Sequence, residues 1–196
     1  MTKILNDLAA VRTGLVISRK KAKIDSSNKI KYNQLSLKCF EDGIRPNREQ
    51  IDTFISGEEI DKKYLTKKGD VIVRLRSPNR AIYIDKEDEG LLIHSLLAVI
   101  RVHSDKLFPK YLAYFINATQ TQQALKKDIK GTAISMLKTK DLQKLKIVLP
   151  PMEKQKKLVK FLELADEERD LLKNLIEEKE RFSQSILNTI IKQNKG

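Results

Sequence analysis

The 196-residue sequence contains little of several residue types, and each shortage excludes a class of protein. There is one cysteine, Cys39, which excludes a disulfide framework and predicts a reducing, cytoplasmic location. Only two histidines, His94 and His103, accompany that thiol, so we expect no zinc site. No apolar run reaches the ~18 residues that a membrane helix needs, and the N-terminus has no signal-peptide core. We therefore predict no membrane partner. We expect Cys39 to be a small buried apolar residue and His94 to be a core or edge residue.

Sequence motifs for catalysis are also missing. The sequence has no glycine-rich phosphate loop followed by Lys-Ser or Lys-Thr. Leu149-Pro150-Pro151-Met152 lacks the acid or amide and the aromatic residue of an adenine-methylation tetrad. We therefore expect a binding protein without catalytic residues, metal or bound cofactor.

The charge is present in excess and is unevenly distributed. The formal net charge is +13. Residues 1–150 contain 29 Lys and Arg against 17 Asp and Glu, a balance of +12, whereas residues 151–196 are close to neutral, at +1. Such a distribution is expected if the first region binds a polyanion such as double-stranded DNA. A surface that is simply rich in lysine is the alternative interpretation.

Residues 1–108 contain short apolar segments separated by turn residues, a pattern typical of strands. The expected elements are a short helix over Lys3–Ala10, strands over Val11–Ser18 and Asn33–Phe40, a loop over Glu41–Asp61, a hairpin of Val71–Arg76 with Ala81–Ile84, and a buried strand pair or bent strand over Leu91–Val102.

A helix is predicted from Pro109 to about Asp128, because proline favours the first helical position and apolar residues recur on one face. Gly131 then either ends this helix or lets the backbone approach a phosphate. Leu145–Leu149 alternates as a strand that Pro150-Pro151 ends. Strands followed by a late helix indicate an α+β domain over residues 1–150.

Residues 151–196 form the second predicted domain, a single long helix. From Glu153 to about Asn194 there is neither proline nor glycine. Apolar residues recur at nearly heptad spacing, as in a coiled coil. The expected dimerisation residues are Leu172, Leu175, Phe182, Ile186 and Ile190. We expect the partner helix to come from another chain; a helix that folds back on its own domain is the alternative.

Several motifs, in this order, resemble those of type I restriction–modification DNA specificity subunits. They are the Gly69-Asp70 turn before a strand, the helix Pro109–Asn117, the Gly131-Thr132 loop, and the segment Leu145–Gln155 with its Leu-Pro-Pro-Met-Glu-Lys-Gln ending. Together they cover essentially the whole sequence. The segment Lys130–Gln155 is the most informative, because it joins the loop, the strand, the diproline and the long helix.

The resemblance implies a target recognition domain followed by a spacer helix. Full-length members carry two of each, with antiparallel spacer helices, whereas this sequence has one of each. We therefore expect a half-size subunit that forms a homodimer and reads a bipartite, palindromic DNA site. The resemblance also implies a DNA methyltransferase subunit and a restriction or translocase subunit as partners, which supply the S-adenosylmethionine and ATP chemistry.

Basic and amide side chains that cluster at turns are the predicted DNA contacts. Lysines suit phosphates, and Arg or Asn on rigid turns suit guanine or adenine edges. For any single residue, a solvated surface charge is the alternative. The predicted set is Arg19, Lys20, Lys21, Arg45, Asn47, Arg48, Arg76, Asn79, Arg80, Lys130, Thr132, Lys138 and Lys140.

A second function from a different class remains open. The long helix could be the functional part of a coiled-coil assembly factor, or of an inhibitor that occupies the specificity position of a restriction complex. In both cases the basic domain would read no bases.

Overall fold

The computed structural model describes residues 1–23, 29–40, 43–128 and 136–193. Its contacts divide the chain into two compact units, Met1–Lys157 and Leu158–Gly196. We call the first unit the body. The border lies inside the long C-terminal helix, seven residues beyond the boundary predicted at residue 150.

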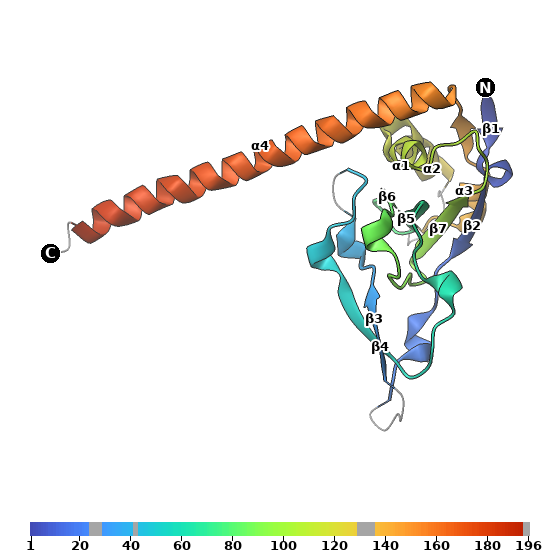
Figure 1. Ribbon diagram of the computed structural model, residues 1–196, viewed down its shortest axis with the longest axis horizontal. Helices are drawn as coiled ribbons and strands as arrows, with labels where there is room; N and C mark the ends of the chain where they lie inside the picture. Colours follow the sequence, from blue (N-terminus) through green and yellow to red (C-terminus); the bar gives the residue numbers. More distant parts are fainter. Residues whose placement is uncertain (24–28, 41–42, 129–135, 194–196) are drawn as a thin grey trace. The chain divides into compact units, whose positions relative to one another are not determined.

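The body is mixed α+β, as predicted, and its described residues form three antiparallel sheets, whose strands are labelled in Figure 1. Its strands are β1 Thr2–Ile4, β2 Ala9–Thr13, β3 Ile30–Gln34, β4 Asp52–Ser56, β5 Asp70–Arg74, β6 Ala81–Tyr83, β7 Leu97–Val102 and β8 Lys146–Val148. The central sheet has the order β2-β7-β5-β6, and two-stranded sheets are formed by β1 with β8 and by β3 with β4.

The helices come late in the chain, as expected. They are α1 Pro109–Asn117, α2 Thr119–Asp128, α3 Thr139–Gln143 and α4 Met152–Gln193. Helix α1 packs on β5 and β6, and α3 packs on β2. Among the described residues, no helix has the length and apolarity to cross a membrane.

The central sheet supplies the main core. Ile72, Ile82 and Val99 lie on one of its faces and pack with Leu35 and Cys39, all of them at most 1% exposed. Cys39 is thus a buried apolar side chain, as predicted, and its Sγ donates to the Gln50 carbonyl at 3.2 Å.

The predicted hairpin and the predicted diproline junction are confirmed. Strand β5 pairs with β6 in the register Val71–Tyr83, Ile72–Ile82 and Val73–Ala81. Gly69 has φ +90°, a conformation that glycine adopts without strain, and it begins the turn into β5. Strand β8 ends just before Pro150-Pro151, and α4 starts at Met152.

Several predicted elements differ from the structure. The strand over Val11–Ser18 is displaced to β2, Ala9–Thr13, and Ile17 and Ser18 lie in a 3-10 turn, Ile17–Lys20. The helix over Lys3–Ala10 is wrong: that segment contains β1, a 3-10 turn and the start of β2, because β1 pairs with β8. The loop over Glu41–Asp61 contains β4, which is held by β3. The strand over Asn33–Phe40 is displaced to β3, and Ser36 caps a 3-10 turn after it. Only the second half of Leu91–Val102 is a strand, β7.

The predicted helix Pro109–Asp128 is also interrupted. Ala118 is extended, with ψ 139°, and separates α1 from α2. Gln122 Nε2 donates to the Ile116 carbonyl at 2.8 Å, a group that a continuous helix would have paired with a backbone N–H. Asn117 instead binds strand β6: its side-chain amide pairs with both backbone groups of Ala81, each at 2.8 Å.

The contacts of the Gln155 side chain explain why the diproline motif ends in glutamine. Its side chain is fully buried in the first turns of α4. Nε2 donates to the carbonyls of Lys106 and Pro150, each at 2.8 Å, and Oε1 accepts from the Phe108 N–H at 2.9 Å. The helix start is therefore fixed to the segment that precedes α1.

Candidate nucleic-acid interface

The first predicted basic cluster, Arg19 to Lys21, lies beside β4. Arg19 and Lys20 end a 3-10 turn, and Lys21 forms an antiparallel bridge with Ser56. Arg19 and Lys21 are exposed, whereas Lys20 forms an ion pair with Glu58. Two cations of this cluster are therefore exposed at a sheet edge.

The second cluster, Arg45 to Arg48, is largely engaged in local structure. The Asn47 side chain accepts from the Glu49 N–H at 3.0 Å and caps a short 3-10 turn. Arg48 Nε lies 2.7 Å from Asp88 Oδ1, and Nη1 lies 2.7 Å from Glu87 Oε2. The hydrogen bond to Asp88, followed by the one to Glu87, raises the pKa of Arg48. Arg45 is exposed.

The third cluster lies in the β5–β6 turn. Arg76 is exposed and Arg80 is half-buried. Asn79 is 1% exposed, and its Nδ2 donates to the carbonyls of Arg74 and Leu75 at 3.1 and 3.0 Å. Its amide thus holds the turn together, so we assign Asn79 a structural role and leave it out of the interface.

The fourth cluster adjoins the third. Lys138 and Lys140 are exposed at the start of α3. Arg76 bridges Met136 in an antiparallel arrangement, and the Leu137 N–H donates to the Leu75 carbonyl at 2.8 Å. The structure therefore brings these two basic turns side by side. The other predicted members, Lys130 and Thr132, and the neighbouring Gly131, lie outside the described residues.

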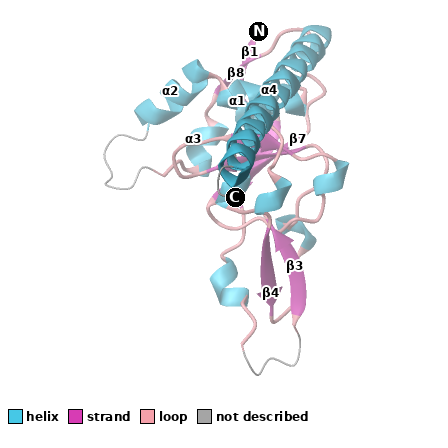
Figure 2. Ribbon diagram, turned by 90° about the vertical axis from the view of Figure 1, so that its left-hand side faces the viewer, coloured by secondary structure: helices cyan, strands magenta, loops and turns pink. Residues whose placement is uncertain are grey.

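A further polar surface was missed by the sequence analysis. Lys31 and Asn33 on β3 and Thr53 and Ile55 on β4 are all exposed. They lie on one face of the two-stranded β3–β4 sheet, which we call the β3–β4 ribbon (Figure 2). The alternation Ile30-Lys31-Tyr32-Asn33 was the available signal, since alternate strand residues face opposite sides.

The helix α4 has an uncovered apolar face. Every described residue from Asp170 to Ile191 is exposed, including the predicted dimerisation residues. Their exposed fractions are 53% for Leu172, 50% for Leu175, 67% for Phe182, 46% for Ile186 and 50% for Ile190. Leu171, Ile176 and Leu187 are exposed as well. We call these eight residues the α4 stripe.

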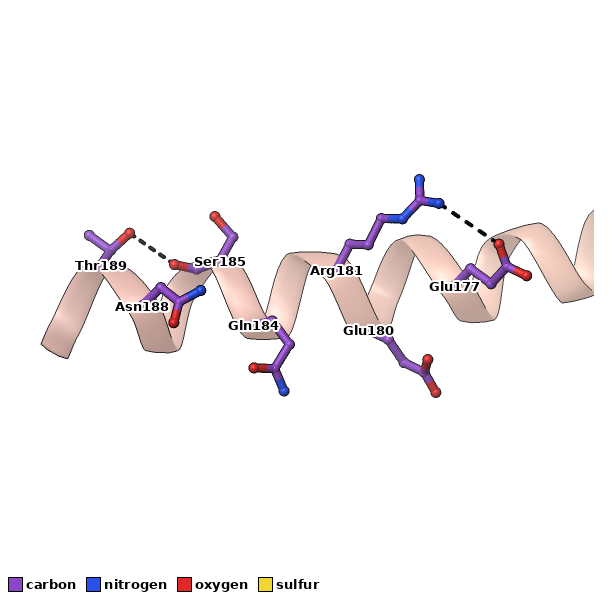
Figure 3. A pocket seen from close by; sticks show the side chains of 7 residues that line it. All are labelled: Glu177, Glu180, Arg181, Gln184, Ser185, Asn188 and Thr189. Atoms are coloured by element: carbon purple, nitrogen blue, oxygen red, sulfur yellow. Dashed lines mark hydrogen bonds and ion pairs between the residues drawn. The ribbon is translucent and has the colours of Figure 1, made fainter. Parts of the chain in front are cut away.

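Polar residues occupy the other side of the same helix, as the 3.6-residue period requires. Figure 3 shows side chains on that side, with Arg181 and Glu177 paired across one turn. They line a hollow that this one helix forms alone. Its residues are Glu177, Glu180, Arg181, Gln184, Ser185, Asn188 and Thr189.

The buried ionisable groups Asp70 and His94 have local partners in the body. Asp70 Oδ1 lies 2.7 Å from Arg101 Nε, and this ion pair joins β5 to β7. His94 is 8% exposed, in agreement with the prediction, and its Nδ1 accepts from the Leu96 N–H at 3.1 Å. Burial lowers the pKa of His94, and the charge of Asp52 opposes this shift. Both groups are satisfied by neighbouring backbone or side-chain partners.

Nothing among the described residues forms a metal site, since no group of three His, Cys, Asp or Glu side chains converges there. A groove of about 910 Å³ lies between α2 and β8, where Lys144 and Lys146 adjoin Phe115 and Val148. The chemistry that the described body offers is thus that of exposed cations and amides on rigid turns and strands.

One comparison with known proteins identifies a family. The family model described as the type I restriction modification DNA specificity domain matches residues 1–181. No curated protein sequence matches this chain.

Solved structures of similar fold come from the same kind of system. An HsdS subunit from Thermoanaerobacter tengcongensis has a TM-score of 0.65 and 16% identity, over 89% of this chain and 44% of that one. The S subunit of a type I system from M. genitalium has a TM-score of 0.58 and 16% identity, over 90% and 41%. A third structure, from a study of complex assembly and conformational transition of the type I R-M system, has a TM-score of 0.59 and 19% identity, over 89% and 40%. The chain therefore spans less than half the length of these relatives.

Proposed function

The chain belongs to the type I restriction–modification DNA specificity domain family, and from this membership we propose that it reads DNA sequence for such a system. The observation that carries the proposal is the separation of two surfaces. The strongly basic region, residues 1–150, presents exposed cations on turns and strands, and α4 presents an uncovered apolar stripe.

The basic turns supply the DNA contacts in this proposal. Lys21, Lys138 and Lys140 neutralise phosphates, and Arg45 and Arg76 contact phosphates or guanine edges from turns of defined geometry. The adjacency of the Arg76 and Lys138 turns supports one continuous basic surface at that end of the β5–β6 hairpin.

The α4 stripe supplies the contact with a second copy. Burying a Leu, Ile or Phe side chain contributes roughly 1.5–3 kcal/mol, so eight such residues favour a partner helix. Two copies related by a two-fold axis would present two recognition domains and would read a bipartite, palindromic site. This homodimer is part of the proposal.

Catalysis is assigned to other subunits. We propose that a DNA methyltransferase subunit brings S-adenosylmethionine, that a restriction or translocase subunit brings ATP, and that this chain holds neither. The complex would act in the cytoplasm, where a lone reduced thiol such as Cys39 is ordinary.

The test is to measure DNA affinity against salt and molecular mass on the purified full chain. We expect a dimer whose affinity for a specific site falls steeply between ~50 and ~200 mM salt, because phosphate contacts release counterions. Co-purification of a methyltransferase subunit is expected in addition. A dimer that binds no DNA would instead identify a coiled-coil assembly factor or inhibitor.

A further inference from the structure

The β3–β4 ribbon has two faces of opposite character. In its antiparallel register Lys31 lies opposite Ile55, and Asn33 lies opposite Thr53. These two pairs share one face, because directly paired residues point to the same side and alternate residues to opposite sides. The pair Tyr32–Phe54 lies between them in sequence and faces the other way.

The inner face fixes the ribbon to the body. Phe54 is buried with Ile60 and Leu92, and Tyr32 packs against this cluster. Tyr32 Oη accepts from the Ile60 N–H at 2.9 Å. At the end of β3 the Leu92 N–H donates to the Asn33 carbonyl at 2.8 Å. The ribbon is therefore anchored along its length, and its outer side chains have defined positions.

The outer face carries side chains of the types that can bond or contact base edges. An asparagine amide can bond both adenine N6 and N7, a threonine hydroxyl can donate or accept, and an aliphatic side chain can contact a thymine methyl. Asn33, Thr53 and Ile55 offer these three groups within one small patch, and Ile55 is 47% exposed. Lys31 adds a cation beside them.

The charge around the ribbon suits a polyanion. Residues 19–23, 29–34 and 52–59 contain six lysine and arginine residues and three acidic ones, of which Glu58 is paired with Lys20. The basic segment runs along the outer edge of β4, where the Ala22 N–H donates to the Ile55 carbonyl at 3.0 Å. Figures 1 and 2 both place the ribbon at the end of the body away from α1 and α2, and its outer side chains Lys31, Asn33, Thr53 and Ile55 are exposed.

We propose that the outer face of the β3–β4 ribbon enters the major groove of double-stranded DNA and determines sequence specificity there. A two-stranded ribbon has the width that this groove admits. Asn33 reads adenine, Ile55 and Thr53 contact the adjoining thymine methyl or base edge, and the lysines of the flanking segments bind phosphates. This inference rests on the proposed function and names the side chains that carry its selectivity.

The test uses the full chain, with any subunit that co-purifies, and selection from a randomised double-stranded DNA library. For Asn33→Ala we expect the preferred base at one position of the selected site to relax. Affinity for the wild-type site should fall about 5- to 100-fold, with affinity for random DNA and the salt slope unchanged. Thr53→Ala and Ile55→Ala should relax a neighbouring position.

A second variant distinguishes base reading from lost stability. Asn33→Asp keeps the size of the side chain but replaces the amide donors by acceptors, so the preference should change from adenine to cytosine, whose N4 donates. Gln123→Ala, at an exposed site on α2, is the matched control and should leave the selected site intact. Circular dichroism and urea unfolding verify that each variant is folded.

The inference is overturned if Asn33→Ala and Asn33→Asp both keep the wild-type site with affinity within about twofold. If the wild-type protein selects a site and these variants retain it, only the assignment to the ribbon fails. If the wild-type protein selects no sequence, the proposed function fails and the ribbon assignment fails with it.

Discussion

The body and the part of α4 after Lys157 use similar apolar residues in opposite ways. In the body, Leu5, Ile72 and Ile100 are fully buried. Helix α4 is 42 residues long, or roughly 60 Å. Its residues Leu172, Phe182 and Ile190 are at least half exposed. Charge differs too, at +12 for residues 1–150 and +1 for 151–196. The body buries most of its large apolar side chains, whereas those of the α4 stripe are exposed.

The largest expected effect comes from placing charge in the α4 stripe. Leu175→Glu combined with Phe182→Glu puts two carboxylates where an apolar interface is proposed, and unpaired buried charges are costly. We expect the dimer dissociation constant to rise at least ~100-fold, with the body still folded. Analytical ultracentrifugation measures the mass, and urea unfolding measures the stability of the body.

A control with the same change in charge sharpens this result. Gln184→Glu with Asn188→Glu adds two carboxylates to the polar side of α4 shown in Figure 3. This variant should remain dimeric. Equal dissociation of both variants would mean that total charge, and not the stripe, controls assembly.

The next effect concerns the first turns of α4, which belong to the body. Gln155→Ala leaves the Phe108 N–H and the carbonyls of Lys106 and Pro150 without their side-chain partner. We expect the free energy of unfolding to fall by about 2–4 kcal/mol. The exposed Gln123→Ala should change it by less than ~0.5 kcal/mol. Similar values for the two variants in urea unfolding would contradict the structural role of the motif.

A smaller effect is a pH dependence that is confined to the body. Because burial lowers the pKa of His94, the unfolded state binds its proton more readily than the folded state. The contribution of neutral His94 to the free energy of unfolding is therefore complete above the ordinary pKa of 6.5. This contribution is lost as the pH falls below 6.5 towards the lower pKa of the folded state. His94→Asn keeps an acceptor for the Leu96 N–H and should flatten this part of the pH profile. An unchanged profile would assign the dependence to other groups.

The smallest effect tests the charge difference between the two regions. Arg76→Ala should weaken binding to all DNA sequences a few-fold and reduce the slope of log affinity against log salt by about 1. Lys173→Ala removes one cation from α4 and should leave the slope unchanged. Fluorescence anisotropy at several salt concentrations measures the slope for each variant. Equal slopes for Arg76→Ala and Lys173→Ala would mean that Arg76 does not contact DNA phosphates.

Local signals made part of the fold predictable. The β5–β6 hairpin follows from two apolar strands around a short turn, and the β8–diproline–α4 junction follows from the stop that proline imposes. The predicted helix over Lys3–Ala10 failed because β1 is stabilised by β8, about 140 residues away. The residues of Lys3–Ala10 alone do not indicate that β1 pairs with β8.

The site was less predictable for a similar reason. Composition identified basic turns, yet Asn79 is buried because its amide bonds the turn's own carbonyls. Asn33 was missed because the strand was predicted over Asn33–Phe40, so the alternation Ile30-Lys31-Tyr32-Asn33 was not used. Its exposure also depends on which side of β3 packs against Leu92.

The central claim is that the basic body reads DNA and the α4 stripe joins two copies of it. The most direct measurement is sequencing of methylated bases in genomic DNA from cells with and without this protein. We predict a split, palindromic motif whose methylation disappears with the protein and reappears with the wild-type gene, but not with the Leu175→Glu, Phe182→Glu variant. Methylation that is unchanged by loss of the protein, or a protein-dependent motif that is asymmetric or contiguous, would contradict it.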